Sequence, residues 1–161
     1  MTLTLRLGVI DVPYTEKDGA TTGDVAEILE AKYGVYEVFY ENNAQAVGDA
    51  LTEGFQGSLE SVIMGRQMTL EQAFDPGTAT IDTLFKNWLS SGAIESLGIP
   101  GVPTKASQDR KSSRFKKGKS PRTRPSFIDT GLYESSFKST VEYTDWDQVT
   151  RAAANAFQGG R

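Results

Sequence analysis

One short stretch of the sequence contains the residue types of a catalytic turn. The tripeptide Asp129-Thr130-Gly131 follows two apolar residues. A carboxylate in such a turn, paired with the same carboxylate of a second copy, could share a proton with it and activate a water molecule. The alternative is structural, because Asp129 or Thr130 could cap a short helix over residues 132–137. Such a cap stabilises a helix by about 0.5–2 kcal/mol.

The surrounding sequence resembles aspartic proteases only in part. Residues 63–66, Ile-Met-Gly-Arg, resemble the apolar-apolar-Gly-Arg element of the retroviral-type enzymes. In that family the catalytic turn precedes the Gly-Arg element, whereas here it lies more than sixty residues after it. Leu132 also follows the turn where that family has a small residue, and the neighbouring pattern is helical. The cap is therefore the favoured interpretation, and we expect no catalytic residue in this stretch.

The chain has no histidine and no cysteine. It therefore lacks the commonest general base, the commonest metal ligand, thiolate nucleophiles and disulfides. Asp145 and Asp147 flank Trp146, but side chains two residues apart diverge on a helix and share a face only on a strand. We interpret them as acids at a helix start rather than as ligands of a nuclease metal. No glycine-rich phosphate-binding loop is present, so we expect no metal, no cofactor and no enzymatic activity.

The charge distribution along the chain is uneven. Residues 105–124 contain nine of the 17 basic residues and one of the 21 acidic ones, so this basic segment carries about +8 and the remainder about −12. Such segregation is typical of an arm that binds nucleic acid, an acidic neighbour, or the acidic body of its own oligomer. The alternative is a solvated loop without a partner. The basic residues are Lys105, Arg110, Lys111, Arg114, Lys116, Lys117, Lys119, Arg122 and Arg124.

Length and composition favour one domain over residues 1–161, with a flexible basic arm at about residues 98–124. A domain of this size can bury roughly two thirds of its unfolded surface. A hydrophobic content of 38% is somewhat low for a compact enzyme, which favours surfaces completed by partners. The N-terminus lacks the features of a secretory signal, and no apolar run is long enough to span a membrane. We therefore expect a protein that is made in the cytoplasm and has no membrane contact.

The first half of the chain contains the patterns of a strand and two helices. Apolar residues alternate over residues 2–12, which predicts a strand with one buried face. Asp24 and Glu27 form a capping-box pattern before a short helix that ends near Gly34. A longer helical stripe follows over residues 36–64. Its interior glycines indicate close helix packing or a bend, unless they merely weaken a long surface helix. They are Gly48, Gly54 and Gly57.

A third helix is predicted before the basic segment. Residues 75–77, Asp-Pro-Gly, are expected to break the chain, after which Thr78 or Thr80 can cap a helix that ends before Gly92. Its aromatic residues are expected to belong to the core rather than to a ligand site.

Two more elements are predicted after the basic segment. Alternation over residues 137–143 predicts a strand, and residues 146–157 predict a helix with an apolar side. That side consists of Val149, Ala152, Ala153, Ala156 and Phe157. The predicted fold class is α+β, a small antiparallel sheet packed with several helices, with a long basic loop insertion.

The junction at the end of the basic segment resembles a recurring element of tailed-bacteriophage virion-morphogenesis proteins, the group of neck, head-tail connector and tail-completion proteins. In that group a basic loop enters the pattern R-P-x-x-x-D-T-G-x-L/Y-x-x-S and then a β-strand. The match covers about a tenth of the chain directly. The matching residues are Arg124, Pro125, Asp129, Thr130, Gly131, Leu132 and Ser136, with Phe137 opening the strand.

The resemblance implies a non-enzymatic subunit of a homo-oligomeric ring in the virion, assembled in the host cytoplasm. The implied partners are copies of the same chain and a neighbouring connector, tail terminator or tail tube. The basic segment would act as an assembly arm, with nonspecific contact to DNA as a further use, and the Asp-Thr-Gly turn would anchor it. The alternative is a nucleic-acid-binding accessory protein that uses residues 105–124, with Phe115 stacking on a base.

Overall fold

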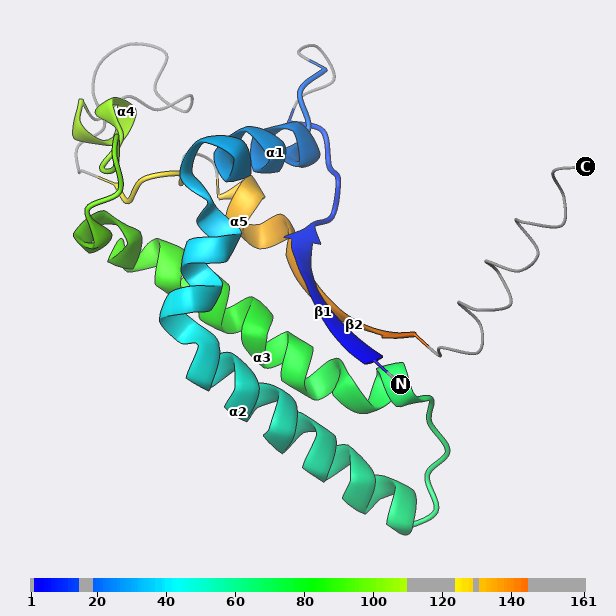
Figure 1. Ribbon diagram of the computed structural model, residues 1–161. Coiled ribbons are helices and arrows are strands. Elements are labelled where there is room, and N and C mark those ends of the chain that lie inside the picture. The colour runs from blue at the N-terminus through cyan, green and yellow to red at the C-terminus, as the bar shows by residue number, and fades with distance from the viewer. Residues whose placement is uncertain (1, 15–18, 110–123, 129–130, 145–161) are drawn as a thin grey trace, which may run out of the picture.

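The computed structural model describes residues 2–14, 19–109, 124–128 and 131–144. In this part of the chain, five α-helices pack with one two-stranded antiparallel sheet, which confirms the predicted α+β class (Figure 1). The elements in order are β1 (Thr2–Val9), α1 (Thr22–Tyr33), α2 (Val35–Ile63), α3 (Leu70–Ser90), the 3-10 helix η1 (Ala93–Leu97), α4 (Lys105–Gln108), α5 (Leu132–Ser136) and β2 (Phe137–Thr144).

The sheet joins the two ends of the described chain. β1 and β2 pair from Thr2 opposite Thr144 to Val9 opposite Phe137. The first strand is shorter than the predicted range of residues 2–12, because the hydroxyl of Thr22 donates to the carbonyl of Ile10 at 2.7 Å and draws the chain towards α1. The strand predicted over residues 137–143 is confirmed.

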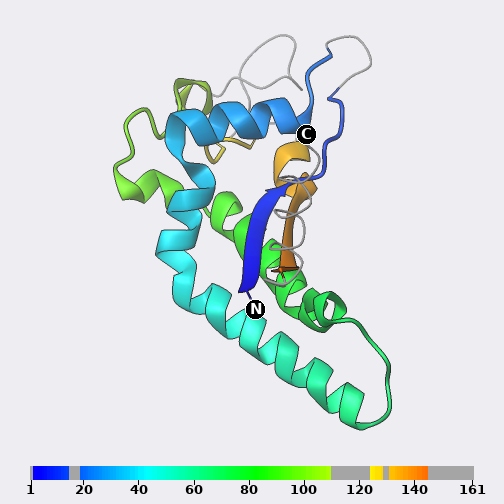
Figure 2. The ribbon, with the colours of Figure 1, turned by 45° about the vertical axis from the view of Figure 1, so that its right-hand side comes forward.

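The helices α2 and α3 form an antiparallel hairpin beneath the sheet (Figures 1 and 2). Their backbones approach each other closely at two glycines. A Cβ atom on Gly54 would lie 2.4 Å from the backbone nitrogen of Gly77, and one on Gly77 would lie 2.7 Å from the carbonyl oxygen of Ala50. Only glycine permits this approach, so the predicted close packing is confirmed at Gly54. At Gly48 and Gly57 an added Cβ would meet no described atom within 4 Å.

The core is an aromatic cluster between the hairpin and β2. Phe85 and Phe137 stack with ring centroids 3.8 Å apart, and Phe39 meets Phe85 edge-on at 5.1 Å. Phe39 and Phe85 are fully buried, and Trp88 is nearly so. Such pairs each add about 0.5–1.5 kcal/mol beyond the burial of their area. The prediction that the aromatic residues of the third helix belong to the core is therefore confirmed.

The start of the first helix differs from the prediction. The cap of α1 is Thr21, whose hydroxyl accepts from the backbone nitrogen of Asp24, while the Asp24 carboxylate accepts from the nitrogen of Thr21 at 2.9 Å. Asp24 is therefore the third residue of the helix and not its cap. The helix ends before Gly34, as predicted.

The third helix starts eight residues before the first predicted cap. Thr69 and Gln72 form a capping box, and α3 continues through Pro76 without ending. A proline inside a helix removes one backbone hydrogen bond. Packing along α2 outweighs that loss, because Gly77 lies directly against the backbone of Ala50 and Leu51. The predicted break at residues 75–77 is therefore wrong.

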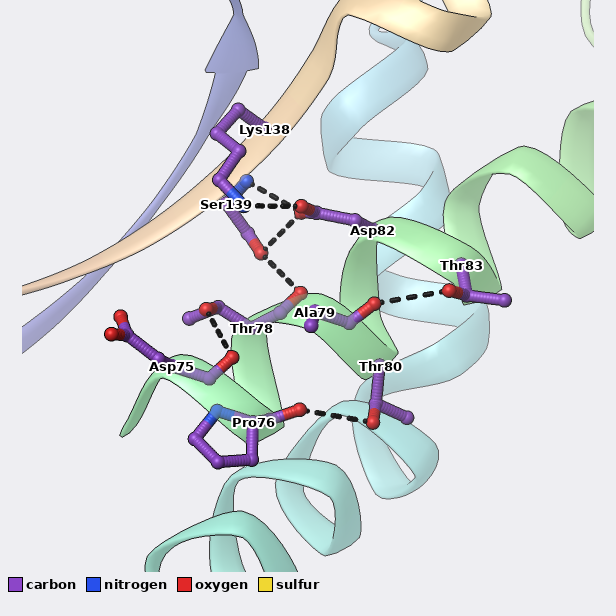
Figure 3. Close-up of polar contacts among 9 residues, drawn as sticks. All are labelled: Asp75, Pro76, Thr78, Ala79, Thr80, Asp82, Thr83, Lys138 and Ser139. Carbon is purple, nitrogen blue, oxygen red and sulfur yellow. Dashed lines mark hydrogen bonds and ion pairs between the residues drawn. The ribbon is translucent and has the colours of Figure 1, made fainter. Parts of the chain in front are cut away.

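A buried polar contact fastens β2 to α3 (Figure 3). The Asp82 carboxylate accepts from the backbone nitrogen and the hydroxyl of Ser139, both at 2.7 Å, and from the Lys138 ammonium at 2.8 Å. The Ser139 hydroxyl also lies 2.9 Å from the carbonyl oxygen of Thr78. These contacts give the backbone nitrogen of Ser139 an acceptor on α3, so α3 packs against β2 at this position.

Among the described residues, none of the helices has the length and apolar character that crossing a bilayer requires. The helix predicted over residues 146–157 lies outside the described residues.

Candidate assembly surface at the root of the basic segment

The basic segment begins with regular structure. Residues Lys105–Gln108 form α4, a single turn capped by Thr104, whose hydroxyl accepts from the backbone nitrogen of Ser107 at 3.3 Å. The predicted loop insertion is therefore helical at residues 105–108. Thr104, which precedes the basic residues, can cap a helical turn. It is the sequence feature that could have indicated α4.

Ser126 joins the two ends of the basic segment. Its hydroxyl accepts from the backbone nitrogen of Thr104 at 3.0 Å and lies 3.3 Å from the hydroxyl of Ser107. Its backbone nitrogen and hydroxyl both donate to the Glu95 carboxylate, each at 2.8 Å. Ser126 is fully buried. The described residues on the two sides of the segment 110–123 therefore lie together at one place, which we call the root of the basic segment.

The chain leaving the root makes a tight turn. The guanidinium of Arg124 donates to the carbonyl of Ile128, so this basic residue contributes to the turn. Phe127 has φ of 69°, which is unusual for a bulky side chain, and its ring packs on Tyr33 of α1 with centroids 4.9 Å apart. This contact holds the root against α1 and offsets the backbone strain.

The turn matched to the phage element is only partly described. Asp129 and Thr130 lie outside the described residues, as do Arg110, Lys111, Arg114, Lys116, Lys117, Lys119 and Arg122. The residue at the N-cap position of α5 is Gly131, with φ of 80°, and not the predicted Asp129 or Thr130. Glycine adopts this left-handed conformation without steric penalty. Ser136 ends α5, donates to the carbonyl of Tyr133 at 2.9 Å and lies buried beside the sheet.

The root has no arrangement typical of catalysis in the part that the structure describes. A shallow cleft of about 390 Å³ lies beside it, lined by residues that include Glu95, Ser107 and Arg124. The polar groups of Glu95 and Ser107 are already engaged with Ser126 and Thr104. No group of three or more acidic residues among the described positions could hold a metal ion.

An acidic surface lies on α2, outside the root. This helix of 29 residues has no basic residue, and all five of its acidic side chains are exposed. They are Glu37, Glu41, Asp49, Glu53 and Glu60. At 1.5 Å per residue, the acidic residues are spread along about 35 Å of the helix. Sequence reasoning found the negative charge of the body but did not show that these five carboxylates are all exposed on a helix without basic residues.

No protein-family model, no curated protein and no solved structure matches the chain.

Sequence reasoning did not identify Ser126 or Glu95. Serine and glutamate are common surface residues, and only the fold shows that these two meet at the root.

Proposed function

We propose that this chain is a structural subunit of a tailed-phage virion, in a ring at the neck, at the head-tail connector or at the end of the tail. The observation that supports this proposal best is the Ser126 joint. It presents residues 110–123, which carry seven basic residues and no acidic one, from a fixed place on an acidic body. An arm held at both ends is suited to bridging from one subunit to the next.

The acidic surface of α2 supplies a matching partner for such an arm. In a ring, the basic segment of one subunit would lie against the exposed carboxylates of a neighbour's α2. Opposite charges arranged in this way raise association rates and fix the register of the contact. A closed ring of identical subunits needs two different complementary surfaces on each copy, and the basic segment and α2 are such a pair.

The proposal is tested by searching for the protein in particles. Mass spectrometry of purified virions should detect the chain at a fixed copy number, and electron microscopy of the purified protein under assembly conditions should show rings. Absence from virions, together with a strictly monomeric protein, would overturn the proposal.

The second candidate is a nucleic-acid-binding accessory protein that uses the same basic segment. The observation in its favour is Phe115 among the basic residues, because aromatic rings stack on exposed bases. Binding through phosphates should weaken steeply as salt increases. A salt titration with single-stranded and duplex DNA therefore tests it, and failure to bind at low salt and micromolar protein would exclude it.

A further inference from the structure

The end of the helix hairpin carries a group of apolar side chains that the described part of the chain leaves exposed. Leu59, Val62 and Ile63 lie three or four positions apart, so they share one face of α2. Met64 follows them at the end of the helix, and Ile63 is 76% and Met64 87% exposed. Single exposed apolar side chains are common on protein surfaces, whereas contiguous ones mark sites of interaction. We call these four residues the hairpin tip.

The tip is exposed because of how the two helices are aligned. Gly54 lies against Gly77 in this antiparallel pair, so the start of α3 at Leu70 is level with residue 61 of α2. The last three residues of the tip come after that level. Figures 1 and 2 show this end of the hairpin projecting beyond the sheet. The apolar face of α2 therefore continues past the part that α3 covers.

A second apolar surface lies between β1 and α2. It is a groove of about 490 Å³. None of its lining residues carries a charge, so the groove suits an apolar occupant and not the basic segment or a nucleic acid. Its lining includes Leu3, Leu5 and Leu7 of β1 and Tyr40, Val47 and Gly48 of α2. We call this the β1–α2 groove.

The tip and the groove of one molecule cannot meet. Both belong to α2, which is a single continuous helix from Val35 to Ile63. Val47 in the groove and Ile63 at the tip are about 24 Å apart along its axis at 1.5 Å per residue. A helix does not fold back on itself, so the tip can reach only the groove of another copy.

We propose that the hairpin tip of one copy inserts into the β1–α2 groove of a second copy. A cavity of roughly 150 Å³ holds one benzene ring, so a groove of about 490 Å³ has room for two side chains of the tip. Charge favours the same pairing. The exposed Arg66 follows the tip, and the exposed carboxylates of Glu41 and Asp49 adjoin the groove on α2.

This inference rests on the proposed assembly of copies into a ring, and it names the surfaces through which the copies meet. The tip and the groove are different surfaces, so their contact is head-to-tail and closes into a ring where the rotation between copies permits. The two proposals can fail separately. Mass spectrometry of virions tests the virion role, whereas the purified protein tests the contact.

Single cysteines test the contact without interference, because the chain has no cysteine of its own. Full-length Gly48→Cys is mixed with isotope-labelled, full-length Met64→Cys and oxidised mildly. The control mixture contains Gly57→Cys in place of Gly48→Cys, because Gly57 is an equally open glycine of α2 outside the groove. The mixed disulfide should form at least roughly tenfold faster in the Gly48 mixture than in the Gly57 mixture.

Each outcome of the oxidation decides the question. A faster mixed disulfide in the Gly48 mixture supports the proposal. Equal rates in the two mixtures overturn it. Disulfides that form mainly between two copies of Met64→Cys overturn it in favour of a tip-to-tip dimer.

A matched pair of isoleucines gives a second readout that needs no cysteine. Ile63→Asp should raise the Kd of self-association at least roughly tenfold, because its carboxylate would be buried in the apolar groove. Ile28 on α1 is also largely exposed, at 62%, and Ile28→Asp should leave the Kd unchanged.

Light scattering over a dilution series measures both variants. It is done in 1 M salt, where a Debye length of about 3 Å screens contacts made by charge alone. Equal Kd values for the two variants, or no association of the unsubstituted protein, would overturn the proposal.

Discussion

At the scale of single residues, two buried polar side chains connect parts of the chain that are distant in sequence. Asp82 joins α3 to β2, and Ser126 joins η1 to both ends of the basic segment. Each is satisfied by several hydrogen bonds, as buried polar groups in folded proteins usually are. Removing one partner would leave the others unsatisfied, so both positions are sensitive to substitution.

Asp82→Ala should lower the free energy of unfolding by about 2–3 kcal/mol, because it leaves the buried nitrogen of Ser139 without an acceptor and removes the contact with its hydroxyl. Asp82→Asn should have a smaller effect, since it keeps one acceptor oxygen. Thr83→Ala is the matched control on the exposed side of α3 and should change stability by less than about 0.5 kcal/mol. Urea denaturation measures all three, and equal values for Asp82→Ala and Thr83→Ala would contradict the role of Asp82.

Ser126→Ala should loosen the root without unfolding the body. The nitrogen of Thr104 loses its acceptor, a local loss of about 1–3 kcal/mol. Hydrogen exchange of α4 should therefore accelerate, while exchange in α3 stays unchanged. Ser135→Ala, at an exposed serine of α5, serves as the control. Unchanged exchange of α4 in Ser126→Ala would show that the joint does not hold the root.

Buried tyrosines should make the protein sensitive to alkali. Burial raises the pKa of Tyr133 and of Tyr36, and a nearby Glu30 carboxylate raises both further. The folded state therefore keeps its phenolic protons at a pH where the unfolded chain, with a tyrosine pKa of about 10, loses them. Stability is fully present below that pH and falls above it, by up to about 1.4 kcal/mol per pH unit for each tyrosine.

Urea denaturation between pH 8 and pH 11 measures this loss. Tyr133→Phe should show a shallower alkaline slope than the unsubstituted protein. Identical slopes would assign the loss to other groups, such as lysines.

At the scale of elements, the contact between α2 and α3 determines where the helices can lie. The hairpin packs backbone against backbone at Gly54 and Gly77, which explains how α3 continues through Pro76. The sheet then lies on this hairpin through β2, and β1 lies beside α2 with an apolar groove between them. One close approach therefore sets both the length of α3 and the surface that remains uncovered.

Gly54→Ala and Gly57→Ala should change stability in opposite directions. The Cβ of Gly54→Ala meets the backbone of α3, and the helices must separate at a loss of about 1–3 kcal/mol. Gly57 faces open space, so alanine there should stabilise by up to about 1 kcal/mol through its higher helix propensity. Thermal and urea denaturation measure both variants, and a neutral Gly54→Ala would contradict the close packing of the hairpin.

At the scale of the whole molecule, the separation of charge is also a separation in structure. The basic segment leaves the body at the root, and five exposed carboxylates lie on α2. Charge pairs between subunits at exposed sites are screened by salt, with a Debye length of about 10 Å at 0.1 M and about 3 Å at 1 M. Assembly through these surfaces should therefore weaken as salt increases.

A charge exchange tests the contact between the basic segment and α2. Lys116→Glu with Lys117→Glu should abolish oligomers in light scattering at low salt, whereas Lys32→Glu on α1 should not. Adding Asp49→Lys and Glu53→Lys to the first variant should restore assembly, because the charges are then exchanged between the two surfaces. Failure of this rescue, with all variants folded, would show that α2 is not the partner of the basic segment.

Much of the local structure could be predicted from the sequence. Alternation of apolar and polar residues predicted both strands, and helical periodicity predicted α2 to within one residue at each end. These patterns arise because one face of each element is buried and the other is not. The predicted break at Pro76 and the late start of α3 were wrong, because the packing of Gly77 on α2 is a tertiary contact that local propensity does not include.

The candidate site was predictable in part for the same reason. The charge of residues 105–124 can be read directly from the sequence, whereas the Ser126 joint depends on Glu95 and Thr104, which the fold brings to it.

By itself, the sequence determined the fold class, the two strands and the charge of the basic segment, since these depend on residue types and on periods along the chain. Only the tertiary structure decided that Ser126 joins the two sides of the root, that all five carboxylates of α2 are exposed, and that an apolar groove lies between β1 and α2. These features depend on how elements distant in the sequence pack together, and no local pattern contains that information.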